Sequence, residues 1–428
     1  MLRKSPYRKL VVGTETKVPL LNNNLVKYIN FDNAATTPPL HCVMEAVNEF
    51  APWYSSIHRG KGYKSLLSSK MFEEARDIIA DFVNVSMNNN IVIYVKNTTE
   101  AINKLSYRLC QESDSQNECV VLSTDMEHHS NDLPWRDKFK IDYIDINDQG
   151  FLSLESLESK LIEYSGQVKL VTVTGASNVT GYINPINKIA GLCHQYNARL
   201  LIDGAQLVPH EPIDMQEEID FLVFSAHKMY APFGMGVLIG PMDFFEKGAP
   251  EYRGGGTVQI VTQRNVFWDK PPHKEEAGTP NILGVIAMVE SIKKLSEIGM
   301  DNIAAYEREL TNYTINNIKT IPNIQLYNNG INTKKVSIIP FNIKGLSHEE
   351  VADILAQQYG IAVRNGCFCA QPYIQKLLKV SNQKIEKHMK NPNALHPGLV
   401  RISFGMYNQK EEVDYFLEAL KEIVGSYT

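Results

Sequence analysis

The residue best suited to covalent chemistry is Lys228, which comes shortly after an apolar run at 219–224. The run predicts a buried strand, and the Gly- and Pro-containing segment after the lysine predicts a loop at the edge of a sheet. Ligands of open α/β sheets bind in the crevice that forms at this edge of the sheet. A low dielectric there favours the neutral amine, which is the form that condenses with an aldehyde. An isolated lysine would more often only end a strand, so the interpretation depends on its neighbours.

A second apolar run, at 199–202, ends in Asp203. Two such runs with a short connection predict neighbouring strands, which would bring Asp203 and Lys228 to the same rim of one sheet. Pyridoxal phosphate needs this pair, because a lysine binds its aldehyde and a carboxylate keeps its ring nitrogen protonated as an electron sink. Taken alone, the aspartate could equally be a turn residue.

Polar groups suited to a phosphate follow another predicted strand. The segment 96–103 opens a helix, so its free backbone N–H groups and the hydroxyls of Thr98 and Thr99 would point at one spot. Geometry and the helix dipole make such a spot an anion site. A simple N-cap at Thr99 is a compatible alternative. Ser225 and His227, close to the lysine, could add further phosphate donors.

His128 and His129 follow a different predicted strand. A histidine at that position could stack on a cofactor ring and transfer protons. Adjacent histidines are more often exposed or metal-related, but no carboxylate or histidine stands at regular ligand spacing from this pair. We therefore expect no metal.

Two thiols and two arginines mark the last quarter of the chain. Cys367 and Cys369 flank Phe368 in a Gly-containing loop, a spacing too strained for an easy disulfide and too incomplete for zinc. A thiol on such a loop near Arg364 ionises readily and can act as a nucleophile, although a lone cysteine is more often inert. Arg401 lies in a β-rich run, where it could clamp a substrate carboxylate or form an interdomain salt bridge.

The elements that must position these residues alternate between helix and strand. From about residue 70 to 240, helical patterns separate β-rich runs at 91–95, 118–122, 168–173, 200–202, 221–224 and 235–239. This alternation predicts an α/β fold with a mainly parallel, helix-flanked sheet, whose last pair of strands includes an antiparallel strand. Amphipathic helices at 284–298 and 302–321, strands at 336–341 and 399–403, and a helix at 411–424 then predict a smaller α+β domain.

The chain of 428 residues is longer than one hydrophobic core usually serves. We expect an N-terminal arm at 1–29 that packs on the small domain, a large cofactor-binding domain at 30–290, and a small domain at 291–428 that carries the cysteine loop. The polar, lysine-rich segment 381–397 predicts an exposed insertion.

Composition excludes several classes of function. A formal net charge of −5 argues against a nucleic-acid partner or a polybasic membrane anchor. No run is long and apolar enough to span a bilayer, and the basic N-terminus lacks the apolar segment of a secretory signal. Six cysteines in so long a chain do not make a disulfide framework. These features predict a cytoplasmic enzyme with no membrane partner.

Taken together, the segments resemble the class V, fold-type I pyridoxal-phosphate enzymes, and among them the Suf-type (NifS-like) cysteine desulfurase and selenocysteine lyase family. The resemblance runs from Phe-Asp-Asn-Ala-Ala-Thr-Thr-Pro at 31–38 to Arg-Ile-Ser-Phe-Gly-Met-Tyr-Asn at 401–408. The matching segments between them are Thr-Thr-Glu-Ala-Ile-Asn, Glu-His-His, Asp-Gly-Ala-Gln and Ser-Ala-His-Lys. The resemblance implies a fold-type I transferase, with a mainly parallel sheet of the seven-stranded type and a smaller α+β C-terminal domain.

The resemblance also implies how the chain holds its cofactor. Lys228 would form the Schiff base, Asp203 would face the pyridine nitrogen, His128 would stack on the ring and Gln206 would bond the phenolic oxygen. The phosphate would be held by Thr98, Thr99, Ser225 and His227.

The implied substrate is L-cysteine, which would be converted to alanine. Asn178, Arg364 and Arg401 would bind this substrate, and Cys369 would receive its sulfur as a persulfide for transfer to an acceptor protein in iron–sulfur or related cofactor biosynthesis. Thr279, in Glu-Ala-Gly-Thr, would reach the phosphate of a partner subunit, which implies a homodimer with shared sites.

Alternatives remain open at this point. The chain could be a class V aminotransferase, a selenocysteine lyase or a C–S lyase acting on another amino acid, or a silent scaffold for a sulfur-transfer complex. Cys367 stands where bacterial Suf-type enzymes usually carry a histidine, so it could relay or resolve the persulfide.

Overall fold

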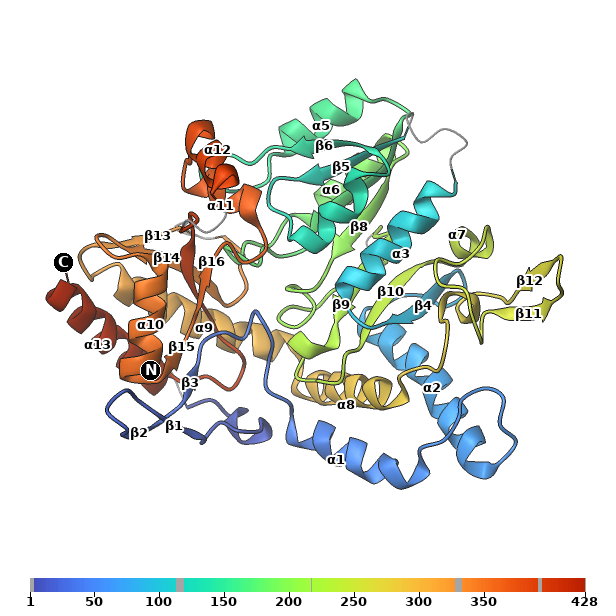
Figure 1. Cartoon of the computed structure of the whole chain (residues 1–428), viewed down its shortest axis with the longest axis horizontal. Helices are drawn as coiled ribbons and strands as arrows, with labels where there is room; N and C mark the ends of the chain where they lie inside the picture. Colours follow the sequence, from blue (N-terminus) through green and yellow to red (C-terminus); the bar gives the residue numbers. More distant parts are fainter. Residues whose placement is uncertain (1–3, 113–118, 217, 328–332, 392–394, 428) are drawn as a thin grey trace.

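The computed structural model describes residues 4–112, 119–216, 218–327, 333–391 and 395–427. A seven-stranded sheet with the order β4-β10-β9-β8-β7-β5-β6 forms the centre of the larger part (Figure 1). Its strands are β4 (Asn90–Val95), β5 (Val120–Thr124), β6 (Lys140–Ile144), β7 (Val168–Thr174), β8 (Arg199–Asp203), β9 (Phe221–Ser225) and β10 (Gly236–Pro241). β10 is antiparallel to both of its neighbours, and the other neighbouring pairs are parallel. The predicted mainly parallel sheet and its antiparallel member are therefore confirmed.

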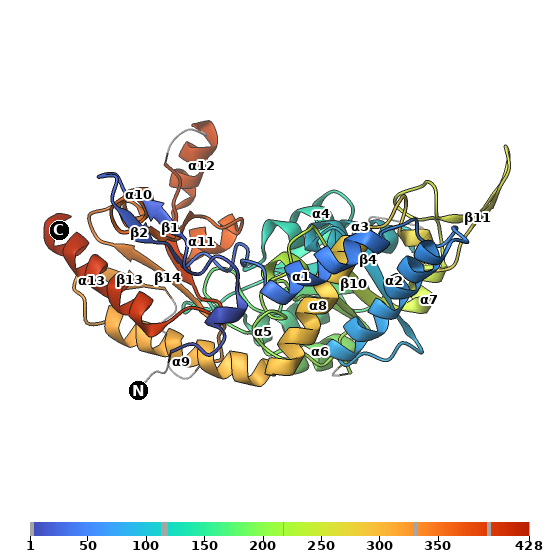
Figure 2. The same cartoon turned by 90° about the horizontal axis from the view of Figure 1, so that it is seen from below.

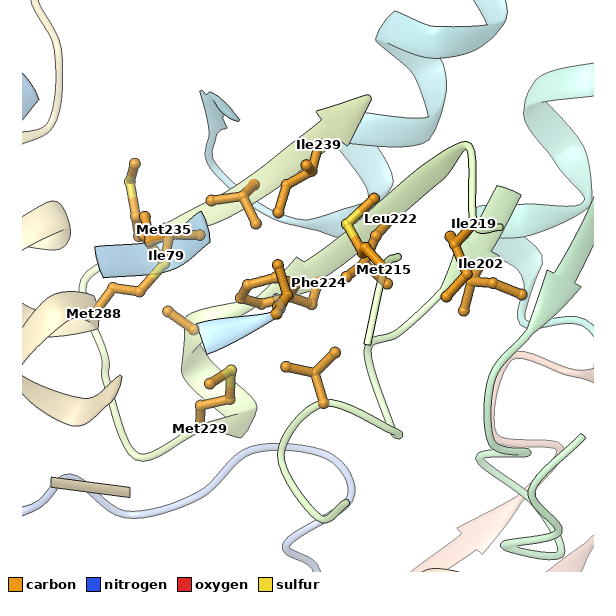
Figure 3. Packing of buried hydrophobic residues seen from close by; sticks show 14 of the residues in the cluster. Ile79, Ile202, Met215, Ile219, Leu222, Phe224, Met229, Met235, Ile239 and Met288 are labelled. Atoms are coloured by element: carbon orange, nitrogen blue, oxygen red, sulfur yellow. The ribbon is translucent and has the colours of Figure 1, made fainter. Parts of the chain in front are cut away.

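Both faces of this sheet are covered, which explains why its strands are continuous apolar runs. Along β9, Leu222 and Phe224 enter one hydrophobic cluster, whereas Phe221 and Val223 enter another. Alternate side chains of a strand point to opposite faces, so each cluster lies on its own face. Figure 3 shows Leu222 and Phe224 packed in the first cluster, which also contains Met229.

Helices on the two faces include α2 (Tyr63–Phe82), α3 (Thr98–Cys110), α6 (Ile186–Gln195) and α8 (Ile282–Ile298). α8 contacts α2 and α1 (His41–Phe50), while α3 contacts β9 and β10. Further helices and strands of this part are α4 (Leu133–Arg136), α5 (Leu154–Glu163), α7 (Met242–Glu246), β11 (Val258–Val261) and β12 (Val266–Trp268).

A four-stranded sheet of order β13-β14-β17-β16 occupies the C-terminal third. It consists of β13 (Ile324–Leu326), β14 (Ile338–Ile343), β16 (Arg364–Gly366) and β17 (Leu399–Ser403), with all pairings antiparallel. The helices α9 (Met300–Ile318), α10 (His348–Tyr359) and α13 (Lys410–Tyr427) contribute to its hydrophobic core. The predicted α+β region is confirmed. β14 begins two residues later than expected, because Val336 donates its N–H to Gly181 O instead of joining the sheet.

The N-terminal segment lies against this C-terminal region. β3 (Ile29–Asn30) pairs in parallel with β15 (Ile361–Ala362), and Arg8 forms an ion pair of 2.8 Å with Glu412. Two further short strands, β1 (Lys17–Pro19) and β2 (Leu25–Lys27), form a hairpin of their own. The expected boundary at 290/291 falls inside α8, and the division into domains stays a prediction.

Two helices follow the cysteine loop, α11 (Gln371–Leu377) and α12 (Asn382–Lys390). α12 has no buried residue and projects from the body of the molecule (Figure 2). This exposure agrees with the exposed insertion expected at 381–397. Residues 392–394 of that segment lie outside the described part of the chain. Residue 118, the first residue of the strand expected at 118–122, also lies outside it. No described helix has the length and apolar character needed to cross a membrane.

Candidate active site

A cavity of about 240 Å³ lies at the carboxyl ends of β8 and β9, between the two sheets. The predicted site residues that line it are Thr98, Thr99, His128, Asn178, Asp203, Gln206, Ser225, His227, Lys228, Arg364, Cys369 and Arg401. Thr279 does not line it. The fold thus brings residues from distant segments of the chain to one place.

Asp203 and Lys228 occupy the same rim, as the sequence predicted. β8 and β9 are parallel neighbours, with Asp203 opposite Val223, and Lys228 ends a short 3-10 turn directly after β9. Burial raises the pKa of Asp203. The Ala205 N–H, which lies 2.9 Å from Asp203 Oδ1, and the positive charge of Lys228 oppose this rise, because each lowers the pKa. Burial lowers the pKa of Lys228 to about 8, so more of the amine is neutral near pH 7 than for an exposed lysine.

His128 presents a neutral imidazole to the cavity. Burial, with added repulsion from Lys228, lowers its pKa to about 3. Its Nδ1 accepts a hydrogen bond from the Ser130 backbone N–H at 3.1 Å, which places the single ring proton on Nε2. A neutral ring of fixed orientation is suited to stacking on a planar cofactor.

The phosphate region lies where α3 begins. Thr98 donates its backbone N–H to Ser225 Oγ at 2.8 Å, and the two hydroxyls lie 2.7 Å apart. The helix cap is Asn97, whose side chain accepts from the Glu100 N–H at 3.0 Å. The expected cap at Thr99 is therefore wrong: Asn97 has the extended backbone that a cap requires, whereas Thr99 already lies inside the helix.

The cysteine loop is a tight turn held against the large sheet. Ala370 donates its N–H to Cys367 O at 2.9 Å, and the two residues between them, Phe368 and Cys369, have φ values of 52° and 54°. Such left-handed backbone is unfavourable for residues other than glycine. Asn178 Nδ2 donates to Phe368 O at 2.8 Å, a contact that helps to hold this conformation. Cys369 is exposed where it meets the cavity.

Arg364 and Arg401 stand opposite each other on β16 and β17. Both approach Asp32, with Arg401 Nη2 3.2 Å and Arg364 Nη1 3.6 Å from its carboxylate oxygens. Arg401 Nη1 also donates to Asn178 O at 2.8 Å. Burial lowers the pKa of Arg401 to about 10, which leaves it cationic at neutral pH. Asp32 was not predicted, and its only sequence signal was its place in the Phe-Asp-Asn-Ala-Ala segment.

Two buried polar atoms at the cavity have no partner among the described residues. These are Arg401 Nε and Gln206 Oε1, although Gln206 Nε2 donates to Ala34 O at 2.7 Å. Unpaired buried groups are costly, and a polar ligand would satisfy them. With a carboxylate, a lysine and a hydroxyl-rich helix N-terminus in one cavity, the residues fit a phosphorylated pyridine aldehyde. Lining residues that sequence reasoning missed include Ala34, Ala35, Asn97, Ser130, Thr174, Ala205 and Phe368.

Thr279 is exposed in a separate hollow of about 230 Å³, which Glu276 also lines. Glu276 is buried against Arg76, with oxygen–nitrogen distances of 2.8 and 2.9 Å. This pair fixes the start of the segment that leads to Thr279.

Comparison with known proteins assigns the family. The aminotransferase class-V family model matches residues 29–416. A cysteine desulfurase of Wigglesworthia glossinidia brevipalpis is 34% identical over 94% of this chain and 94% of its own length. The chain belongs to the cysteine desulfurase family of class-V aminotransferases. The enzymes of this family depend on pyridoxal phosphate, which agrees with the fit of the cavity and confirms the predicted cofactor and fold type.

Two further likenesses support the cysteine desulfurase family. A probable cysteine desulfurase of Mycolicibacterium paratuberculosis is 36% identical over 96% of this chain, and the chain spans 58% of the length of that relative. The apo structure of a cysteine desulfurase from Thermococcus onnurineus superposes with a TM-score of 0.83 at 31% identity, and the match covers 96% of this chain and 97% of that chain.

Proposed function

We propose that this member of the family converts L-cysteine to L-alanine and retains the sulfur as a persulfide on Cys369. The observation that carries the proposal is the position of Cys369, which is exposed at the cavity that Lys228, Asp203 and Arg401 also line. A nucleophilic thiol, a lysine with a lowered pKa and a carboxylate-binding arginine are the groups that the reaction needs.

The cofactor would be held by the residues already placed at the cavity. Lys228 would bind its aldehyde covalently, Asp203 its ring nitrogen, and Gln206 its phenolic oxygen, with His128 against the ring face. The hydroxyls of Thr98, Thr99 and Ser225 and the ring of His227 would bind the phosphate. When bound, pyridoxal phosphate supplies the electron sink that stabilises negative charge at the substrate α-carbon.

The protein side chains then orient the substrate and move protons. Arg401, with Arg364 and Asn178, would bind the carboxylate and so place the α-proton within reach of Lys228. Once the substrate amine has taken its place on the cofactor aldehyde, the freed Lys228 amine, whose pKa burial lowers to about 8, would accept this proton. The Cys369 thiolate would attack the substrate sulfur as its bond to the β-carbon breaks. The carbon skeleton takes up protons and leaves as alanine, while the sulfur remains on Cys369.

The assembly and location are part of the same proposal. A homodimer would bring the exposed Thr279 to the phosphate of a second subunit, and an acceptor protein would collect sulfur from the exposed Cys369. The six cysteines all lie in the described part of the chain and form no disulfide there, which favours a reducing compartment such as the cytoplasm.

The test is alanine formation from L-cysteine by the cofactor-loaded protein with a thiol reductant, beside Cys369→Ala and the control Cys42→Ala. Cys42 is a partly buried thiol outside the cavity, so its loss should leave activity unchanged. We expect alanine and sulfide in equal amounts, with both lost in Cys369→Ala. Alanine that persists in Cys369→Ala would instead favour direct C–S or selenocysteine lyase action, and no alanine from the parent protein would favour an aminotransferase.

A further inference from the structure

Three side chains of the types that ligate metals meet away from the cofactor cavity: His58, Glu73 and His273. His58 lies in the connection before α2, Glu73 lies within α2, and His273 lies in a 3-10 turn before α8. Their potential ligand atoms all lie within 4.8 Å of one another. None of the three lines the cofactor cavity of its own chain.

The local fold holds His58 in this cluster. Its backbone has a φ of 69°, and its N–H donates to Ser69 Oγ at 2.7 Å. Its Nε2 lies 2.7 Å from Glu73 Oε1. The imidazole makes edge contacts with Phe72 and His273, with ring centroids 5.6 and 4.8 Å apart. Both histidine rings therefore lie beside the same carboxylate.

Glu73 is oriented by a second partner. Its Oε2 accepts from Arg76 Nε at 3.0 Å, which leaves Oε1 on the side of the histidines. The positive charge of Arg76 is itself balanced by its buried pair with Glu276. Ligating carboxylates are commonly fixed by such outer hydrogen bonds.

His273 contributes an unpaired nitrogen. Its Nδ1 is buried and has no hydrogen-bond partner among the residues that the structure describes. A buried imidazole nitrogen without a partner costs free energy, and coordination to a cation would remove that cost.

We propose that His58, Glu73 and His273 bind one divalent transition-metal ion, with water at the remaining position. Two imidazoles and one carboxylate form a ligand set that suits Zn²⁺. Ligand atoms on a tetrahedral zinc ion lie about 3.4 Å apart, so a pair of ligand atoms that now lie within 4.8 Å of one another has to approach by at most roughly 1.4 Å. His58 and Glu73 are partly exposed, which leaves their side chains room to make this change.

The bound ion joins three chain segments, including the one that leads through Glu276 to Thr279. The role that we assign to the ion is structural: it holds these three segments together. No sequence motif predicts the site, because its ligands lie far apart in the chain and meet only in the fold.

The test is a titration of untagged, chelator-treated, cofactor-loaded protein with Co²⁺, followed by its visible ligand-field absorption. The parent for all variants is Cys367→Ser/Cys369→Ser, which removes the loop thiols as competing ligands. His273→Ala and Glu73→Gln remove ligands from the cluster. The matched control is His194→Ala, because His194 also contacts carboxylates, with Asp220 at 2.8 Å and Glu218 at 3.5 Å, but has no second imidazole in the contact.

We expect one equivalent of Co²⁺ per chain in the parent and in His194→Ala, displaced by Zn²⁺, and at least a tenfold weaker affinity in both cluster variants. Cofactor absorbance will report whether each variant is folded, and Glu73→Gln provides the test if His273→Ala does not fold. The absence of stoichiometric binding in the parent would overturn the proposal. Binding of unchanged affinity in a folded cluster variant would also overturn it.

Discussion

The backbone N–H of His129 donates to the carbonyl oxygen of Cys369 at 2.6 Å. This bond joins the loop after β5 to the loop after β16, and so connects the two sheets at the cavity. Gln371 adds a second link, since its N–H lies 3.3 Å from His129 Nε2. His128, the residue before His129, lines the cavity, as does Cys369. The hydrogen bond between the backbones of His129 and Cys369 therefore sets the position of the His128 imidazole relative to the Cys369 thiol.

Asn178→Ala tests how far the position of the thiol depends on these loop contacts. The substitution removes the 2.8 Å hydrogen bond to Phe368 O, which helps to hold the left-handed turn. A single hydrogen bond contributes about 0.5–1.5 kcal/mol, so we expect persulfide formation to fall by up to roughly tenfold with cofactor absorbance unchanged. Single-turnover kinetics at saturating L-cysteine measures this, because saturation removes the contribution that Asn178 would make to substrate binding. The exposed Asn187→Ala serves as control, and equal rates in both variants would contradict the prediction.

Arg401→Lys tests the guanidinium fork at the substrate carboxylate. A lysine cannot keep the bonds to Asn178 O and Asp32 while also offering a donor to the substrate. Hydrogen bonds to charged groups contribute about 1.5–3 kcal/mol, so KM for L-cysteine should rise by roughly 10- to 100-fold. Steady-state kinetics of alanine formation gives KM and kcat separately.

Arg364→Lys is the matched control for that change, because Arg364 is exposed and lies 3.6 Å from Asp32. We expect a smaller rise in KM than for Arg401→Lys. A larger effect at Arg364 would show that the exposed arginine is the principal carboxylate ligand.

The sequence predicted the centre of the site because that centre depends on local order. Neighbouring parallel strands end at one rim, so Asp203 and Lys228 could be placed together from two apolar runs alone. The polar start of a helix likewise located Thr98. The helix cap was misplaced, since Asn97 and Thr99 are both suitable cap types and only backbone geometry distinguishes them.

Features that rest on long-range pairing could not be predicted. Asp32 meets Arg401 only because the chain after β3 runs beside β17, an approach between opposite ends of the sequence. The cluster of His58 and His273 likewise forms only where two distant segments of the chain meet in the fold. Such contacts carry no local periodicity, so neither residue type nor spacing reveals them.

The pKa of Lys228 predicts the pH dependence of cofactor loading. Burial lowers this pKa to about 8 from the usual 10.5, and only the neutral amine attacks an aldehyde. The rate at which apoprotein captures pyridoxal phosphate should therefore rise with pH and level off above about 8. Stopped-flow absorbance measures the rate, and borohydride reduction of Lys228→Arg should trap no adduct at the site. A rate that keeps rising toward pH 10.5 would show that the amine is not desolvated.

Glu276→Gln tests the buried ion pair that fixes the start of the Thr279 segment. Arg76 and Glu276 have side-chain exposures of 5% and 6%, and the carboxylate also accepts the Tyr94 N–H at 2.8 Å. Without the Glu276 charge, Arg76 keeps only the partly exposed Glu73, at 3.0 Å, and breaking a buried pair typically costs up to about 3–5 kcal/mol. We expect the free energy of unfolding to fall by an amount in this range, measured by denaturant titration of the apoprotein.

Glu74→Gln provides the same chemical change on the exposed face of α2, where the ion pair with Lys70 spans 3.6 Å. Exposed pairs contribute about 0–1 kcal/mol, so this variant should unfold nearly as the parent does. Arg76→Met/Glu276→Leu removes both buried charges together and should recover much of the loss seen in Glu276→Gln, since no buried charge is left uncompensated and the partly exposed Glu73 keeps its contact with His58. If the double variant were no more stable than the single one, the hydrogen bond that Glu276 accepts from the Tyr94 N–H, rather than charge balance, would account for the loss.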